Sequence, residues 1–349
     1  MKILLATYDL KGHALPASAV VHHLRDRAHR VDWYSGPTTQ SIATAVNATP
    51  HVSEMGFDTA PAQLGAWLER FDAMRVPQSQ EFGALIKRLK PEIVFADSTM
   101  LGAKDAAHAY DIPLVELGVL PIVSYDTRAA LVLQGAFKGC EAVWPYPNLV
   151  FCGPFLPRPT KWLAPKWFRT LDVAKPWVVV TSGTLVGQQP LQDIVLEAFA
   201  ASGLGDEVEL LIHDNPERHP NLPAWAHVHD WYSWRDVLPR SSLFITNGGY
   251  GAVSEAWAAG CPIIVAGTTE DKLLVGDRVD WISGTGINLG TDTPTAGQIV
   301  GASRAILTYP RFHTAAQAVR YANEGHDGAL YAVRILEEWW RERVNGDRR

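Results

Sequence analysis

The first half of the chain alternates short apolar runs with stretches of helical periodicity. KILLATY, VDWYSG, EIVFAD and PLVELG are almost continuously apolar, and a helical pattern extends from about Leu15 to Arg27. Because these runs do not alternate between apolar and polar residues, we expect strands that are buried on both faces, as in a parallel sheet between two layers of helices.

A second series of the same kind follows a proline-rich stretch. WVVVTSGT, VELLIHD, HVHDW, SLFITN and PIIVAG are its candidate strands, with the helical pattern LQDIVLEAFAAS after the first of them. The sequence therefore predicts an α/β fold of two Rossmann-like, doubly wound domains, which would face each other across a cleft at the carboxyl ends of their strands. We expect domains at residues 1–153 and 177–328, a linker at 154–176, and a helix with a tail at 329–349 that packs back on the first domain.

Length and charge narrow the class of protein. A chain of 349 residues with 47% hydrophobic residues can bury two cores. A net charge of -6 argues against nucleic acid as the partner, and the three cysteines form no metal-binding pattern. The opening MKILLATYDL lacks the long apolar region of a signal peptide, and no run approaches the roughly 20 apolar residues that cross a bilayer. We expect a cytoplasmic protein without stable membrane insertion.

The segment TNGGYGAVSEAWAAG places glycines between a strand and a helix. Asn247, Gly248 and Gly249 follow the strand, and Tyr250 opens the helix. Glycines let backbone N–H groups approach a ligand, and the positive end of a helix dipole favours an anion such as phosphate. Glu255, on the same helix, could accept hydrogen bonds from a ribose beside the phosphates. A tight turn without a ligand explains the two glycines equally well.

Other polar and aromatic residues should lie near this helix entrance. Asp271 and Lys272 follow the next strand, where they could hold sugar hydroxyls, and Trp231 or Trp234 on the preceding loop could stack on a base. Packing in the core is the alternative for each tryptophan.

The stretch from DWYSWRDVLP through NGGYGAVSEAWAAG to GTTEDKLLVGDRVDWISGTG resembles the donor-binding half of GT-B fold glycosyltransferases, the large family that includes plant and bacterial small-molecule glucosyltransferases and macrolide glycosyltransferases. KGHALPASAVVHHLRDRAHRVDWYSGP resembles the opening of the same family. The resemblance implies that Gly248 and Gly249 face the diphosphate of a UDP- or TDP-linked sugar. It implies that Glu255 faces the ribose and that Asp271 and Lys272 face the donor sugar. It also implies that the loop with Thr181, Ser182 and Thr184 touches the phosphates.

Two departures from the family pattern concern the donor. Many members have histidine at the position of Asn247 and glutamine at that of Lys272. Asn247 can still donate to a phosphate oxygen, and Lys272 adds a cation near the sugar or its phosphates. The preference for sugar and nucleotide therefore stays open.

The chemistry implied is a single displacement with inversion at the anomeric carbon. His13, after the first strand, is the candidate base, and Asp97, which ends EIVFAD, matches the family's partner carboxylate. The sequence shows no DxD near the donor strands and no histidine cluster, so we expect no metal and no cofactor besides the nucleotide sugar as co-substrate.

The acceptor side leaves alternatives open. Only about thirty residues separate Leu120 from the linker, where relatives carry a longer segment, so we expect an abridged first domain that takes a small or exposed acceptor, or a partner that completes the site. The acceptor could be apolar or aromatic. Two other interpretations remain: a protein that binds a nucleotide sugar without transferring it, and a transferase that adds GlcNAc to a lipid-linked peptidoglycan precursor. The oligomeric state has no signal in the sequence.

Overall fold

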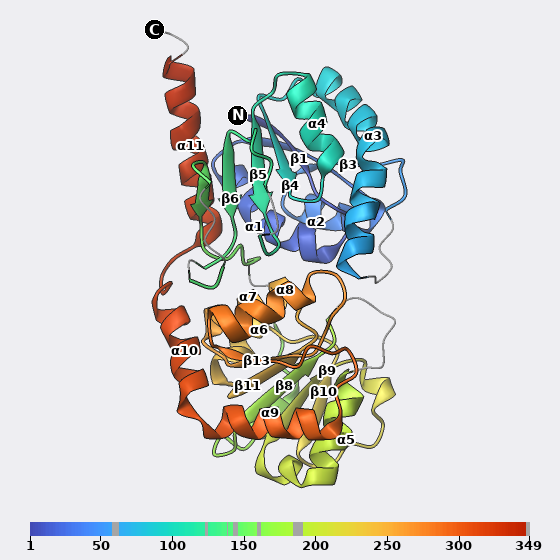
Figure 1. Ribbon diagram of the computed structural model, residues 1–349, viewed down its shortest axis with the longest axis vertical. Coiled ribbons are helices and arrows are strands. Elements are labelled where there is room, and N and C mark those ends of the chain that lie inside the picture. The colour runs from blue at the N-terminus through green and yellow to red at the C-terminus, as the bar shows by residue number, and fades with distance from the viewer. Residues whose placement is uncertain are drawn as a thin grey trace. The chain divides into compact units, whose positions relative to one another are not determined.

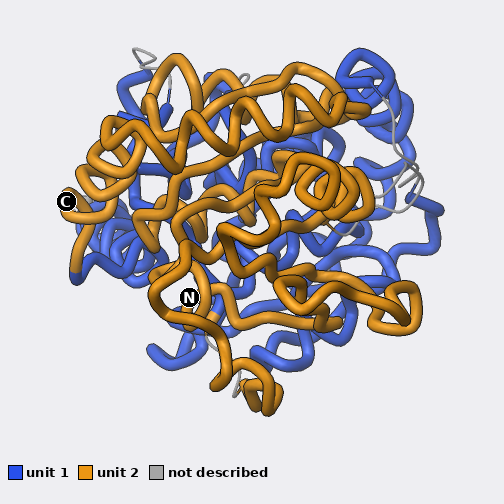
Figure 2. The backbone as a smooth tube through the Cα atoms, turned by 90° about the horizontal axis from the view of Figure 1, so that it is seen from below, with its two compact units in different colours: residues 1–157, 325–349 blue, residues 158–324 orange. Residues whose placement is uncertain are grey.

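A computed structural model describes residues 1–57, 63–122, 125–137, 139–141, 146–158, 162–183 and 191–346 (Figure 1). The chain divides into two compact units, which Figure 2 colours separately: Met1–Pro157 with Gly325–Arg349, and Arg158–Glu324. Each unit has its own parallel sheet with helices on both faces, which confirms the predicted fold class.

The first unit is built on a seven-stranded parallel sheet in the order β3-β2-β1-β4-β5-β6-β7. Its strands are β1 (Lys2–Ala6), β2 (Arg30–Ser35), β3 (Thr49–Val52), β4 (Ile93–Asp97), β5 (Leu114–Gly118), β6 (Leu131–Gln134) and β7 (Leu149–Phe151). The register aligns Leu5 with Phe95 across β1 and β4. The central strands are buried on both faces, as their continuous apolar runs predict.

Successive residues of these strands enter two different cores. Ile3 and Leu5 pack toward α1 (Lys11–Asp26), α2 (Gln40–Ala45) and α11 (Gly328–Gly346). Leu4 and Ala6 pack toward α3 (Leu64–Leu89) and α4 (Leu101–Ala109) on the opposite face. A short 3-10 helix, η1 (Pro37–Thr39), precedes α2.

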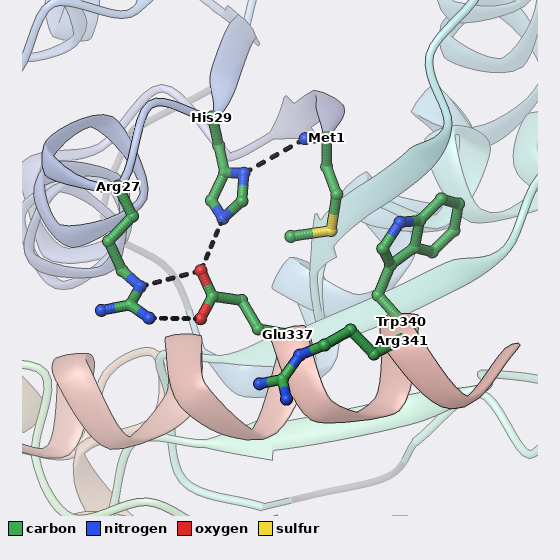
Figure 3. Close-up of a pocket in the computed structure, with 6 residues that line it drawn as sticks. All are labelled: Met1, Arg27, His29, Glu337, Trp340 and Arg341. Carbon is green, nitrogen blue, oxygen red and sulfur yellow. Dashed lines mark hydrogen bonds and ion pairs between the residues drawn. The ribbon is translucent and has the colours of Figure 1, made fainter. Parts of the chain in front are cut away.

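Polar contacts attach α11 to this unit. Glu337 accepts hydrogen bonds from Arg27 Nε at 2.8 Å and Arg27 Nη2 at 2.6 Å, and its Oε1 lies 2.9 Å from His29 Nε2 (Figure 3). At the start of the helix, Asp327 lies 3.1 Å from His23 of α1. The last helix of the chain therefore belongs to the same core as the first.

The second unit repeats the design with a six-stranded parallel sheet in the order β10-β9-β8-β11-β12-β13. Its strands are β8 (Trp177–Thr181), β9 (Glu209–His213), β10 (Ala226–His229), β11 (Leu243–Thr246), β12 (Ile263–Val265) and β13 (Gly286–Asn288). Its helices are α5 (Leu191–Ser202), α9 (Ala296–Thr308) and α10 (Pro310–Tyr321), with α6 (Trp234–Val237), α7 (Tyr250–Ala259) and α8 (Lys272–Asp277) toward the other face (Figure 1). Short 3-10 segments are η2 (Lys166–Thr170), η3 (Leu204–Glu207), η4 (Pro216–Arg218) and η5 (Leu238–Arg240), and η6 (Arg278–Ile282) is a π-helix.

Both sheets reverse their strand order beside their first strand. In the first unit the reversal lies between β1 and β4, and in the second between β8 and β11. At such a switch point the connections leave in opposite directions, which opens a crevice at the carboxyl ends of the two strands. Residues that follow β1, β4, β8 and β11 are therefore the first place to look for chemistry.

Candidate functional site

His13 and Asp97 meet at the switch point of the first unit. Asp97 is the last residue of β4, and His13 stands in the first turn of α1, shortly after β1. Nδ1 of His13 lies 3.1 Å from Oδ2 of Asp97, and the exposed fractions of the two residues are 6% and 0%. The structure thus brings together the two residues that the sequence predicts as the base and its partner carboxylate.

The helix that carries His13 starts earlier than the sequence pattern predicts. The helix begins at Lys11 and not near Leu15, with backbone N–H groups of His13 and Ala14 donating to the Leu10 carbonyl at 3.0 Å. Pro16 lies inside the helix and lacks the N–H that would otherwise donate to the Gly12 carbonyl. Helical backbone fixes the direction of the His13 side chain more tightly than a loop would.

The surroundings of Asp97 keep its carboxyl group ionised. Burial by itself raises the pKa of Asp97, but the charge and hydrogen bond of His13, together with bonds from Thr99 and the backbone N–H of Tyr8, bring it below its usual value. An ionised carboxylate only accepts hydrogen bonds, so Nδ1 of His13 carries the proton. In neutral imidazole this leaves Nε2 with a lone pair that can accept a proton.

Asp9, which was not among the predicted site residues, connects the segment between β1 and α1 to η1. Its carboxylate accepts hydrogen bonds from the backbone N–H groups of Thr38 and Thr39 and from the Thr39 hydroxyl, at 2.9 to 3.2 Å. A side chain at Gly36 would have its Cβ 2.3 Å from an oxygen of Asp9. The sequence GPTT follows β2 and begins the short helix η1, whose first turn contains no acidic residue. This absence is the signal that a carboxylate from another segment could bind the N–H groups there.

The second switch point carries the glycine turn between β11 and α7. Gly248 has a φ of 90°, and the N–H groups of Gly248 and Gly249 point to Thr246 Oγ1 and Asn247 Oδ1, both at 3.3 Å. Asn247 Nδ2 donates to the carbonyl of Ser182, in the segment that follows β8. The amide of Asn247 therefore ties the two segments of this switch point together, a role that its sequence position did not predict.

The chain is similar in sequence to several known proteins. Residues 200–329 match the family described as erythromycin biosynthesis protein CIII-like, C-terminal domain. The chain is 25% identical to 4'-demethylrebeccamycin synthase of Lentzea aerocolonigenes, over 96% of this chain and 99% of that protein. It is 31% identical to UDP-glucosyltransferase A1 of Starmerella bombicola, over 55% of this chain but only 41% of that protein.

Solved structures show the same fold over the whole chain. The spinosyn rhamnosyltransferase SpnG has a TM-score of 0.79 and 18% identity, with 97% of this chain and 100% of that chain covered. SpnG has also been solved with thymidine diphosphate and with spinosyn aglycone. This chain is a GT-B glycosyltransferase. Its matched segment is similar to the macrolide-type members, as the sequence resemblance predicts.

In the glycosyltransferase, Thr181 and Ser182 already have partners within their own unit. Thr181 Oγ1 accepts from Gly183 N–H at 3.1 Å and lies 2.9 Å from His213 Nδ1, while the Ser182 hydroxyl donates to Gln192 and accepts from Leu191 N–H. His213 and Gln192 were not predicted. His213 could have been found from its position, because it is the last residue of β9 and lies in register with Thr181.

The aromatic candidates of the glycosyltransferase differ in exposure. Trp231 is 43% exposed, whereas Trp234 packs edge-on against His213 with ring centroids 5.3 Å apart. Tyr250, the first residue of α7, is buried and meets Trp257 edge-on. Of the two tryptophans, Trp231 offers the more open ring face.

Glu255 lies on the second turn of α7 in a partly buried position. Burial raises its pKa to about 7, against a smaller opposite effect of Arg235. Such a carboxyl group changes its ionisation near neutral pH, which makes ligand binding through it sensitive to pH.

Asp271 and Lys272 stand at the start of α8, beyond the carboxyl end of β12. The Lys272 ammonium is buried, where it binds the Glu270 carboxylate and donates to Thr269 Oγ1 at 2.7 Å. Burial lowers the pKa of Lys272 to about 8. The charge that the sequence places beside the sugar is therefore balanced by a neighbouring carboxylate.

One predicted site residue of the glycosyltransferase, Thr184, lies outside the described residues. Within the described ranges, no group of three or more His, Cys, Asp or Glu side chains is placed to hold a metal ion. In the same ranges, none of the helices combines the length and the apolar character that a bilayer crossing needs.

Proposed function

We propose that this glycosyltransferase moves a hexosyl group from a TDP- or UDP-linked donor to a hydroxyl of a small apolar or aromatic molecule, with inversion and without a metal ion. The observation that carries the proposal is the buried His13–Asp97 pair, whose geometry leaves Nε2 of His13 as the proton acceptor. Deprotonation of the acceptor hydroxyl by a placed base contributes typically ~10²- to 10⁴-fold to the rate.

The reaction is a single displacement. The acceptor oxygen loses its proton to His13 Nε2 and forms a bond to the anomeric carbon, while the bond from that carbon to the diphosphate oxygen breaks and the nucleoside diphosphate leaves with the electron pair. Attack from the side opposite to the leaving group inverts the anomeric configuration. Asp97 stabilises the imidazolium that results, as the carboxylate of a catalytic triad does.

The departing diphosphate needs positive electrostatic potential. The first N–H groups of α7 lie at the positive end of the helix dipole. Gly248 and Gly249 precede these groups, so a phosphate can approach the backbone. This arrangement supports transfer without a metal ion, with Trp231 on the base, Glu255 on the ribose and Asp271 and Lys272 beside the sugar.

The choice of nucleotide in this proposal rests on a structurally similar protein. SpnG has been solved with thymidine diphosphate, which favours TDP in this chain, while the UDP-glucosyltransferase of Starmerella bombicola keeps UDP as the second choice. Two relatives named as natural-product enzymes, 4'-demethylrebeccamycin synthase and SpnG, support a small-molecule acceptor.

Calorimetric titration of the full chain with TDP, UDP and GDP, with and without EDTA, tests the donor half of the proposal. Saturable binding of TDP or UDP that survives EDTA is expected. Transfer is then assayed from TDP-glucose and UDP-glucose to 4-methylumbelliferone and a panel of planar aglycones, with the anomeric configuration read by NMR. Binding without transfer to any acceptor would support a nucleotide-sugar-binding protein instead, and a retained configuration would exclude the single displacement.

A further inference from the structure

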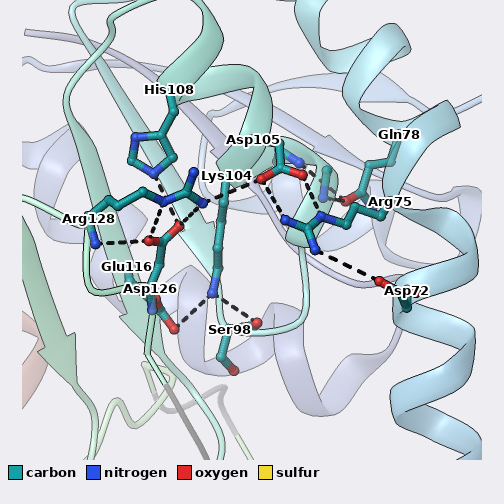
Figure 4. Close-up of polar contacts among 12 residues, drawn as sticks. Asp72, Arg75, Gln78, Ser98, Lys104, Asp105, His108, Glu116, Asp126 and Arg128 are labelled. Atoms are coloured by element: carbon teal, nitrogen blue, oxygen red, sulfur yellow. Dashed lines mark hydrogen bonds and ion pairs between the residues drawn. The ribbon is translucent and has the colours of Figure 1, made fainter.

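A buried ion pair lies behind the turn that carries Asp97. Nζ of Lys104, on α4, is 3.0 Å from Oε1 of Glu116 on β5, and the two residues are 5% and 0% exposed (Figure 4). Desolvation of both charges makes a buried pair no more stabilising than apolar residues of the same volume. Stability alone therefore gives no reason for these charges at this place.

Lys104 also donates a hydrogen bond to the peptide group between Ser98 and Thr99, which faces Asp97. Its ammonium donates to the carbonyl oxygen of Ser98 at 3.0 Å. The N–H of Thr99 belongs to the same peptide group as this carbonyl, and it donates to Asp97 Oδ1 at 2.8 Å. Because a peptide group is planar, a donor that fixes the carbonyl end also fixes the direction of the N–H end. A cation at the carbonyl polarises the group and strengthens the bond to the carboxylate.

Glu116 holds the lysine in this position. In the register of β4 and β5, Glu116 lies opposite Ala96, the residue that precedes Asp97. Its Oε2 accepts a hydrogen bond from the backbone N–H of Asp126 at 2.9 Å. Asp126 is in turn bound by His108 and Arg128 (Figure 4). The carboxylate is therefore fixed from one side and binds the ammonium on the other.

We propose that Lys104, held by Glu116, is a positioning residue for the His13–Asp97 pair, because it aims the Ser98–Thr99 peptide group at the Asp97 carboxylate. The inference rests on the proposed role of His13 as the base. In this proposal Lys104 and Glu116 contact neither donor nor acceptor. Their ion pair affects the rate of transfer and does not affect donor binding.

The first test needs no substrate. In the full chain with ¹⁵N-labelled histidine rings, the Nδ1–H proton bonded to Asp97 is assigned by its absence in His13→Ala. Lys104→Met should speed its exchange with water by ~10-fold or more, the change expected for about 1.4 kcal/mol of lost hydrogen-bond free energy. Asp105→Asn is the matched control, because it removes an ion pair with Arg75 from the next residue of α4 and should leave this proton unchanged.

An unchanged His13 signal in a folded Lys104→Met variant would overturn the inference, as would the lack of any protected signal in the parent chain. If Lys104→Met does not fold, Lys104→Met combined with Glu116→Gln removes both charges, while the amide oxygen of the new side chain can still accept from Asp126 N–H. A failure of the proposed function would give a different result, because transfer would then persist in the His13→Ala variant.

The second test is a double-mutant cycle on kcat with TDP-glucose and the acceptor on which the parent chain is most active. Lys104→Met should lower kcat by ~10- to 100-fold, the cost of a small misplacement, with the donor KM unchanged. In an Asp97→Asn background the same change should cost almost nothing further, since residues that act as a unit are not additive. An equal loss in both backgrounds would show that Lys104 acts independently of Asp97.

Discussion

Nδ1 of His13 donates to Oδ2 of Asp97 across 3.1 Å, and the same oxygen accepts the backbone N–H of Tyr8 at 2.9 Å. The other oxygen is occupied by Thr99. With both oxygens bonded, rotation of the Asp97 carboxylate would break several hydrogen bonds in a buried place, so the imidazole ring is oriented by a group that itself is fixed. The proposed base is therefore held in one orientation before any substrate binds.

Loss of the base should abolish transfer and spare donor binding. His13→Ala removes the proton acceptor, and we expect kcat to fall by ~10²- to 10⁴-fold. Because the donor candidates belong to the other unit, the Kd for TDP should stay within a factor of about two of the parent value. Progress curves and calorimetry on the same preparation measure the two quantities.

His51→Ala is the matched control for this experiment. His51 Nε2 lies 2.9 Å from Asp32 Oδ1, so the variant also deletes a histidine–aspartate pair, but from β3 at the edge of the sheet. Its kcat should equal that of the parent. A similar fall in both variants would attribute the loss to folding and not to the base.

Donor binding should depend on pH through Glu255. Burial raises the pKa of Glu255 to about 7, and a ribose diol needs the ionised carboxylate as a double acceptor. The affinity for UDP should therefore weaken as the pH falls below about 7 and level off above about 8. Glu255→Gln should cost ~10-fold in affinity at pH 8, as expected for one charged hydrogen bond.

The phosphates of UDP also titrate in this range, so the comparison between parent and variant decides the outcome. In Glu255→Gln only the contribution of the phosphates remains, and the pH dependence should be shallower than in the parent. TDP, which lacks the 2'-hydroxyl, should lose less affinity than UDP from the same substitution. Identical pH profiles for parent and variant would remove Glu255 from the ribose site.

The turn before α7 should not tolerate a side chain. Gly248 has a φ of 90°, and a Cβ there would lie 2.7 Å from Cγ1 of Val265. Gly248→Ala should cost about 1–3 kcal/mol of unfolding free energy and lower the affinity for TDP. Gly251→Ala is the control, because a Cβ at that helical position meets nothing within 4 Å, and it should stabilise the helix by ~0.5–1 kcal/mol. Equal unfolding midpoints for the two variants would contradict the strain argument.

The sequence predicted the fold class because nearly every central strand is an unbroken apolar run. KILLATY, EIVFAD, SLFITN and PIIVAG coincide with β1, β4, β11 and β12 to within a few residues. The strands that the pattern missed, β3, β6, β7 and β13, are short and lie toward the sheet edges. The edge strand β3 is only partly buried, and its sequence TPHV carries little apolar signal. The strand β6 is fully buried, but its apolar run LVL is only three residues long.

The site was predictable only as far as strand ends and family positions mark it. His13, Asp97 and the glycines follow strands, so topology alone directs attention to them. Lys104 and Gln192 could not be found in this way, because their roles depend on which groups of distant segments face them in the folded chain. A lysine inside a helix is a surface residue in most proteins, and only its 5% exposure distinguishes Lys104.

The attachment of α11 should depend on the charge of Glu337. The hydrogen bond and charge of Arg27, together with His29, hold the pKa of Glu337 at about 2, below its ordinary value of 4.5. A depressed pKa in the folded state means that the ionised form stabilises the fold above pH 4.5, and that this contribution disappears as the pH falls toward 2. Glu337→Gln should therefore lower Tm at pH 7 by about 2–4 °C, the effect of ~1 kcal/mol on a unit of this size.

The difference in Tm between the parent and Glu337→Gln is the decisive quantity. It should be constant from pH 8 to about pH 5 and should narrow below that, because protonation of Glu337 makes the parent resemble the variant. Glu338→Gln, one residue further along α11 at an exposed position, should show the parent's Tm at every pH. A difference that stays the same down to about pH 3 would mean that packing of α11, and not the charge of Glu337, attaches this helix to α1.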